Sequence, residues 1–163
     1  MSCDSLRNRE ARKQVEIVEL TAKGNYYISP WVDMGISIRT LPLIILKISE
    51  TDDEALFNAA LEAMKYCRMP TLEEDSEYDK TLDSNVIFDD YGFKKATGFG
   101  VMSFFRKDVP NTLLLYTNDN QLDFMYQCNE TMQVGHLYCN VDCPIDEKAK
   151  ILREALNSTV VFK

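Results

Sequence analysis

The sequence predicts a single α+β domain, an α/β protein in the broad sense, with a mainly antiparallel sheet and at least two flanking helices. Short runs of apolar, aromatic and β-branched residues recur at close spacing between turn residues, which favours hairpins over parallel crossovers. Two further segments repeat apolar residues at helical spacing. The 163 residues, 45% hydrophobic and 27% charged, suit one folded domain. We therefore expect one domain over residues 1–163, with the polar residues 1–12 loosely ordered.

The first two strands are predicted at residues 13–20 and 25–29, joined as a hairpin. Residues 13–20 (KQVEIVEL) alternate so that one side is mostly apolar, and residues 25–29 (NYYIS) are aromatic and β-branched. Gly24 and Asn25 between them are turn residues. Pro30 lacks a backbone N–H and is expected to end the second strand.

The first helix is predicted to begin after Thr51. Thr51 and Glu54 match a capping box, with Thr51 as the N-cap. One apolar stripe follows at helical spacing, formed by Leu56, Ala59, Ala60, Ala63, Met64 and Cys67. Pro70 is expected to stop the helix.

The second half predicts an antiparallel meander followed by another helix. The expected strands are 99–105, 111–117, 121–128 and 133–138, with turn residues between them. Pro144 suits the first position of a helix. The apolar stripe of that helix is Ile145, Ala149, Leu152 and Leu156. Residues 159–162 (TVVF) are expected to add a final short strand.

The composition favours a reduced, cytoplasmic setting. No stretch approaches the roughly 18 apolar residues of a membrane span, and the polar start of the chain predicts no signal peptide. The five cysteines are irregularly spaced, which is not a secreted disulfide framework. We expect Cys67 on the apolar side of the first helix and Cys128 in a strand, both as small hydrophobic residues.

The net charge of −8 is concentrated in one short segment. Residues 71–90 carry eight acids and one base, a balance of −7, whereas residues 1–70 balance at −1 and residues 91–163 at zero. Nucleic acid is excluded as a partner, because its backbone requires a positive surface. A basic protein is favoured, since complementary potentials speed association.

Few residues suggest catalysis or metal binding. The single histidine lies in the pattern His136-x-x-Cys139-x-x-x-Cys143, which spans a strand, a turn and a helix start and lacks a fourth zinc ligand. Nothing around these cysteines marks a depressed thiol pKa. No phosphate-binding loop is present. We therefore expect no metal, no cofactor and no enzymatic activity. Trp31 has two interpretations, the cover of a core edge or an interface anchor.

Several segments, taken in order, resemble the immunity proteins of bacterial contact-dependent growth inhibition (CDI) systems. They are YYISPWVDMG from Tyr26, the helix EALFNAALEAMKYCR opening into MP, YGFKKATGFGVMSFFRK around Tyr91, and the closing helix DEKAKILREALN. Together they span residues 26–157. The region 107–116 is less regular than the family pattern, which leaves the subgroup open.

The resemblance implies a cytoplasmic protein that forms a heterodimer with the C-terminal toxin domain of a cognate CDI effector, often a nuclease, and neutralises it. The charge argument, and not the family, supplies the interface candidates, because a carboxylate patch can occupy a basic nuclease cleft. These candidates are Glu73, Glu74, Asp75, Glu77, Tyr78, Asp79, Asp83, Asp89 and Asp90. Two alternatives stay open: a generic acidic protein-binding adaptor, and a small metal or thiol enzyme using His136, Cys139 and Cys143.

Overall fold

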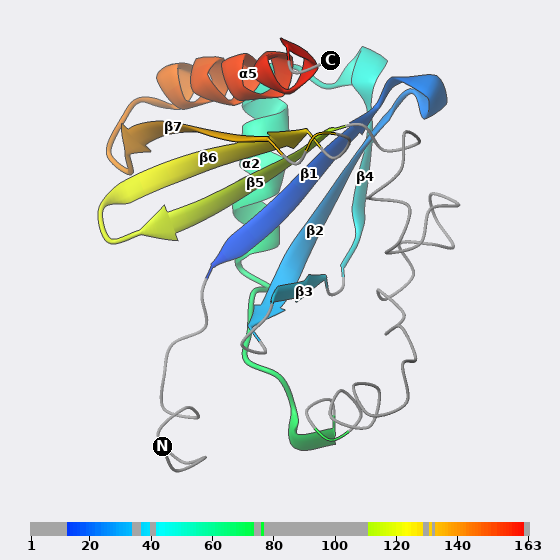
Figure 1. Ribbon diagram of the computed structural model, residues 1–163, viewed down its shortest axis with the longest axis vertical. Helices are drawn as coiled ribbons and strands as arrows, with labels where there is room; N and C mark the ends of the chain where they lie inside the picture. The colour runs from blue at the N-terminus through cyan, green and yellow to red at the C-terminus, as the bar shows by residue number, and fades with distance from the viewer. Residues whose placement is uncertain are drawn as a thin grey trace.

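The computed structural model confirms the predicted fold class (Figure 1). It describes residues 13–33, 37–39, 42–73, 76, 111–128, 131 and 133–161. These residues form an antiparallel seven-stranded sheet and two α-helices. The strands are β1 (Gln14–Leu20), β2 (Asn25–Asp33), β3 (Ser37–Arg39), β4 (Ile44–Lys47), β5 (Asn111–Asn118), β6 (Gln121–Cys128) and β7 (Val134–Asn140). The helices are α2 (Asp53–Met64) and α5 (Ile145–Val161). Residues 1–12 and the predicted strand 99–105 lie outside the described residues.

The strands follow the order β3-β2-β1-β5-β6-β7, and β4 also pairs with β2. The outer side of β2 is therefore shared, by β4 as far as Ile28 and by β3 from Trp31 onward. The expectation that Pro30 ends the strand is wrong, because β2 continues through it to Asp33. Pro30 falls in the gap between these two partners, where a missing N–H interrupts neither ladder.

The β1–β2 hairpin turns at Gly24, as predicted. Gly24 adopts a left-handed conformation with φ 69°, which a residue without a Cβ reaches without strain. Its N–H donates to the carbonyl of Thr21 at 3.1 Å, closing a short 3-10 turn. The register from Val15–Pro30 to Leu20–Asn25 then follows without interruption.

Helix α2 is confirmed, but both of its predicted ends are wrong. Asp52, and not Thr51, is the N-cap, and its carboxylate accepts the Ala55 N–H at 2.8 Å. The Thr51 hydroxyl instead donates to the carbonyl of Lys47 at 2.7 Å, within the preceding turn. The helix stops at Met64, six residues before Pro70, so Cys67 lies beyond it.

The second half forms the predicted meander. Strands β5, β6 and β7 pair in sequence order, and Cys128 is buried in β6 as expected. The β5–β6 turn is two residues long and contains Asp119 with φ 51°, a conformation that Asp tolerates better than most residues. The final strand predicted at 159–162 is wrong, because α5 continues through Val161 and Phe162 lies outside the described residues. The helical stripe that precedes this segment outweighs its β-branched composition.

Both helices cover the same face of the sheet and enclose the main core. Leu56, Phe57, Ala60 and Ala63 from α2 meet Leu152, Ala155 and Leu156 from α5 above the inward side chains of β1, β2, β5 and β6. The ring centroids of Phe57 and Phe124 lie 6.2 Å apart in this core. The strand alternation predicted for residues 13–20 therefore places Val15 and Ile17 in this core.

Arg153 joins α5 to three other elements. Its guanidinium donates to Asp53 of α2 at 2.8 Å, to Glu19 of β1 at 3.1 Å and to the Tyr26 hydroxyl of β2 at 2.7 Å. Partial burial lowers the pKa of Arg153, but the hydrogen bonds to Asp53, Tyr26 and Glu19 raise it above its ordinary value on balance. Burial raises the pKa of Tyr26. Each acceptor belongs to a different element, so one planar donor group fixes the positions of α2, β1 and β2 relative to α5.

We expect Arg153→Met to lower the free energy of unfolding by about 2 kcal/mol. Charged hydrogen bonds contribute up to about 3 kcal/mol, and the partly exposed position of Arg153 reduces that value. Arg153→Lys should recover only part of the loss, because the donors of an ammonium all lie on one atom and cannot reproduce the planar fork of the guanidinium. Urea unfolding followed by circular dichroism measures both variants.

The matched control is Lys150→Met, which removes the same charge from an exposed position of α5. It should change the free energy of unfolding by less than about 0.5 kcal/mol. Equal effects of the two methionine variants would show that the Arg153 contacts contribute little.

Candidate functional site

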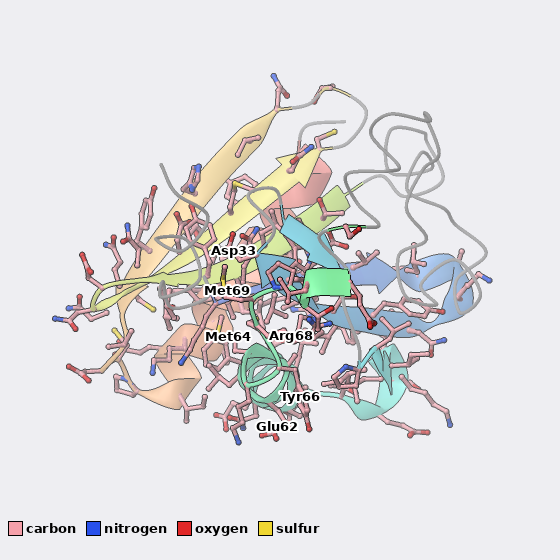
Figure 2. All side chains as sticks on the ribbon, turned by 90° about the horizontal axis from the view of Figure 1, so that it is seen from below. Asp33, Glu62, Met64, Tyr66, Arg68 and Met69 are labelled. Atoms are coloured by element: carbon pink, nitrogen blue, oxygen red, sulfur yellow. The ribbon has the colours of Figure 1, made fainter. Side chains whose placement is uncertain are left out.

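The acidic segment 71–90 starts from a well-anchored stretch of chain. After α2, the Arg68 carbonyl accepts the Asp33 N–H at 3.0 Å, and Arg68 forms an isolated parallel bridge with Val32. The Cys67 thiol donates to the carbonyl of Gln14 at 3.1 Å. Figure 2 shows this path, from Tyr66 past the end of α2 through Arg68 and Met69 to Asp33. The acidic segment therefore starts beside the C-terminal end of β2.

The described start of the segment is exposed. Thr71, Leu72, Glu73 and Ser76 all lie on the surface, and Leu72 is 63% exposed. Of the predicted interface residues, the structure thus places Glu73 on an accessible surface. The others lie outside the described residues: Glu74, Asp75, Glu77, Tyr78, Asp79, Asp83, Asp89 and Asp90.

A second candidate surface is the face of the sheet opposite the helices. The strand register places six buried polar residues on this one face: Gln14, Glu16, Ser29, Asp33, Thr112 and Asp123. We call this surface the polar sheet face. A small apolar cluster of Val18, Leu20 and Tyr27 lies on the same side at one end. The sequence pattern contained the signal, a polar residue at alternate strand positions, but that pattern is equally typical of a strand facing solvent.

Trp31 also belongs to the polar sheet face. It lies inside β2, two residues from Asp33, and is half-buried. Its buried Nε1 atom has no hydrogen-bond partner among the residues that the structure describes. An unsatisfied buried donor costs about 1–3 kcal/mol. The structure therefore does not decide between the cover of a core edge and an interface anchor. Trp31 is part of the sheet, and its indole N–H is an unused donor within the described part of the chain.

At the β7 side of the polar sheet face, Asp123 and His136 form a close pair. Nδ1 of His136 lies 2.9 Å and 3.1 Å from the two oxygens of the nearly buried Asp123 carboxylate. The His136 ring stacks on Tyr138 with centroids 5.7 Å apart and planes 4° from parallel. The carboxylate thus fixes the ring and favours a proton on Nδ1, which leaves Nε2 as the acceptor in the neutral form.

The structure separates His136 from Cys139. Residues 134, 136 and 138 face the polar side of β7, whereas Cys139 faces the helices and joins the main core. Desolvation by burial and the neighbouring Cys143 raise the pKa of Cys139 to about 11. A thiol with a raised pKa is a poor metal ligand and a poor nucleophile at neutral pH. Among the described residues, no group of three or more metal-ligating side chains converges.

No protein-family model matches the chain, and no curated protein matches it. A solved structure does match: a protein of unknown function from Neisseria meningitidis, with a TM-score of 0.62. The similarity is one of fold. The two chains are 15% identical, and the match covers 93% of this chain and 97% of the other. No helix among the described residues is long and apolar enough to cross a membrane.

We expect the free energy of unfolding to fall as pH rises from about 9 to about 11, in part because of Cys139. The unfolded thiol ionises near its ordinary pKa of 9.0, while the folded thiol stays protonated until about 11. The folded state is thus favoured below pH 9, and this contribution is lost through that window. Urea unfolding at several pH values should show a flatter slope for Cys139→Ala than for the unmodified protein. Identical slopes would contradict the raised pKa.

The purified protein should contain no stoichiometric zinc, and chelation should leave its melting temperature unchanged. The physical reason is the opposite orientation of His136 and Cys139 on β7. Elemental analysis and thermal unfolding with and without EDTA measure both quantities. One equivalent of zinc, lost together with stability on chelation, would overturn this expectation.

Proposed function

We propose that this protein is a cytoplasmic immunity protein that binds and neutralises the C-terminal toxin domain of a cognate CDI effector. The observation that carries the proposal is the placement of charge, −7 of the total −8 within residues 71–90. The family resemblance gives the class of partner, and the charge gives the surface. The protein would act as a binding partner and not as an enzyme.

The physical basis is electrostatic complementarity with a basic cleft. A nuclease holds its substrate through cationic side chains that contact phosphates, so clustered carboxylates can occupy the same positions. Such charge accelerates association and rejects partners of the wrong sign. Aspartate and glutamate at the centre of the contact would lose water and contribute most, whereas those at the rim would affect mainly the association rate.

Two features of the described residues support this surface. Leu72, with 63% of its surface exposed, supplies an apolar contact directly beside Glu73. The contacts of Cys67 and Arg68 with β1 and β2 hold the start of the segment against the rigid sheet. A fixed starting point reduces the conformational entropy lost on binding, which improves affinity without additional contacts.

The two alternative functions, a metal or thiol enzyme and an acidic adaptor, require different features of the protein. A metal or thiol enzyme needs His136, Cys139 and Cys143 at one point, and the opposite faces of His136 and Cys139 weigh against it. An acidic adaptor would use the same segment with an unrelated basic protein. The gene immediately upstream discriminates the adaptor from the immunity protein, because a CDI immunity protein should follow a very large exported effector.

The test neutralises four acids together, by Glu73→Gln, Glu74→Gln, Asp75→Asn and Glu77→Gln. Binding to the C-terminal domain of the protein encoded upstream is measured by calorimetry at low and at high salt. We expect the quadruple variant to weaken binding at least about 30-fold, equivalent to about 2 kcal/mol, and to reduce the salt dependence.

The matched control removes four exposed acids elsewhere, by Glu54→Gln, Asp119→Asn, Asp142→Asn and Glu154→Gln. Both variants change the net charge by the same amount, so a difference between them reports position and not total charge. Equal affinity for both variants would place the interface away from residues 71–90. No binding by the unmodified protein would reject the partner itself.

A further inference from the structure

Strand β7 forms one edge of the sheet and is unusually regular for an edge. It pairs with β6 over seven consecutive residues, from Gln121–Asn140 to Gln127–Val134, without a bulge. Among the described strands, none pairs with its other side. The opposite edge of the sheet is different, because it is divided between β3 with three residues and β4 with four.

The backbone hydrogen bonds show which groups of β7 point toward this open side. The Gln133 carbonyl accepts from Cys128, and the Val141 N–H donates to Asn120, so odd-numbered residues bond toward β6. In an antiparallel ladder, alternate residues point their N–H and C=O groups to opposite sides. Val134, His136, Tyr138 and Asn140 therefore direct their backbone groups away from β6.

This edge lacks the features that normally prevent strand pairing. Sheet edges are usually protected by lysine, proline, a bulge or a very short strand. The sequence of β7, VGHLYCN, contains no Lys, Arg, Asp, Glu or Pro. Val134 is 46% exposed, Tyr138 is 51% exposed, and Ile145 just beyond the strand is 37% exposed. These are three of the six large exposed hydrophobic residues in the described part of the chain.

We propose that β7 pairs with β7 of a second copy of this chain, in an antiparallel arrangement centred on Leu137. This register pairs all seven residues. It sets His136 opposite Tyr138 of the second copy, and Val134 opposite Asn140. The outward amides deduced above then face each other in hydrogen-bonded pairs, and the two sheets continue as one.

Two properties of the strand favour a second copy as the occupant. In a two-fold arrangement a charge close to the axis meets a copy of itself, and β7 contains no Lys, Arg, Asp or Glu. The His136 and Tyr138 rings already stack within one chain, so the pairing places four aromatic rings together on one face. The acidic segment starts beside β1 and β2, and β5 and β6 lie between these strands and β7 in the strand order, which keeps its described beginning away from this contact.

A single strand pair lies at the small end of specific interfaces, so we expect a dissociation constant on the order of 10 μM. Sedimentation equilibrium of the free protein from about 1 to 300 μM should show a monomer–dimer equilibrium. Hydrogen–deuterium exchange of the β7 peptide should slow as the protein concentration rises across this range. The slow exchange locates the contact on β7.

The decisive variant is Tyr138→Pro, which removes an outward N–H without removing a β6–β7 hydrogen bond. It should weaken dimerisation at least tenfold. The matched variant Tyr138→Thr also loses the ring but keeps the amide, and should weaken dimerisation less. Circular dichroism and a melting curve establish that both variants are folded.

Three results would overturn the proposal. The free protein could stay monomeric at every concentration, or dimerise without slower exchange in β7, or dimerise equally well as folded Tyr138→Pro. Protection of β7 only after addition of a toxin domain would assign the edge to that partner instead of a second copy. None of these outcomes affects the binding role proposed for residues 71–90, which is measured with different variants.

Discussion

The triple hydrogen bond of Arg153 connects the two ends of the described chain. Its three acceptors are separated from it by 100 to 134 residues along the sequence and belong to α2, β1 and β2. The core holds α5 against the sheet, but the burial of apolar surface is non-directional. A planar donor group with three fixed acceptors sets the position of α5. The same helix follows β7, so its placement also fixes the edge strand of the sheet.

The sheet that this arrangement supports has two chemically different faces. One carries the main core under α2 and α5, while the other buries six polar residues together with the small Val18, Leu20 and Tyr27 cluster. Burying carboxylates such as Glu16 and Asp123 is costly unless hydrogen bonds compensate. For Asp123 the compensation is the bond from His136, which also orients the ring against Tyr138. On the polar sheet face, this hydrogen bond therefore offsets the cost of burying Asp123.

The two proposed contact surfaces lie at different strands of the sheet, separated by β5 and β6 in the strand order. The acidic segment starts beside β1 and β2, and the open edge is β7. The two surfaces also bind through different interactions. Binding by the acidic segment depends on charge, whereas binding by β7 depends on backbone pairing along an uncharged strand. A protein arranged in this way can bind a basic partner and a second copy of itself without competition between the described parts of the two surfaces.

The sequence by itself determined the elements whose signals are local. Periodicity and turn residues predicted β1, the β5–β6–β7 meander and both helices, because each depends on contacts or conformations within a few residues. It also located the charge excess in residues 71–90, although of its named residues only Glu73 falls where the structure describes a position. Tertiary contacts decided where elements end and which polar residues are buried, because local sequence patterns do not encode these features. Pro30 remains in a strand because a gap between β3 and β4 falls there, and α2 ends at Met64 where the chain turns to contact β1 and β2. The burial of Glu16, Asp33 and Asp123 could not be predicted, because alternation gives the same pattern whether the polar face meets water or protein.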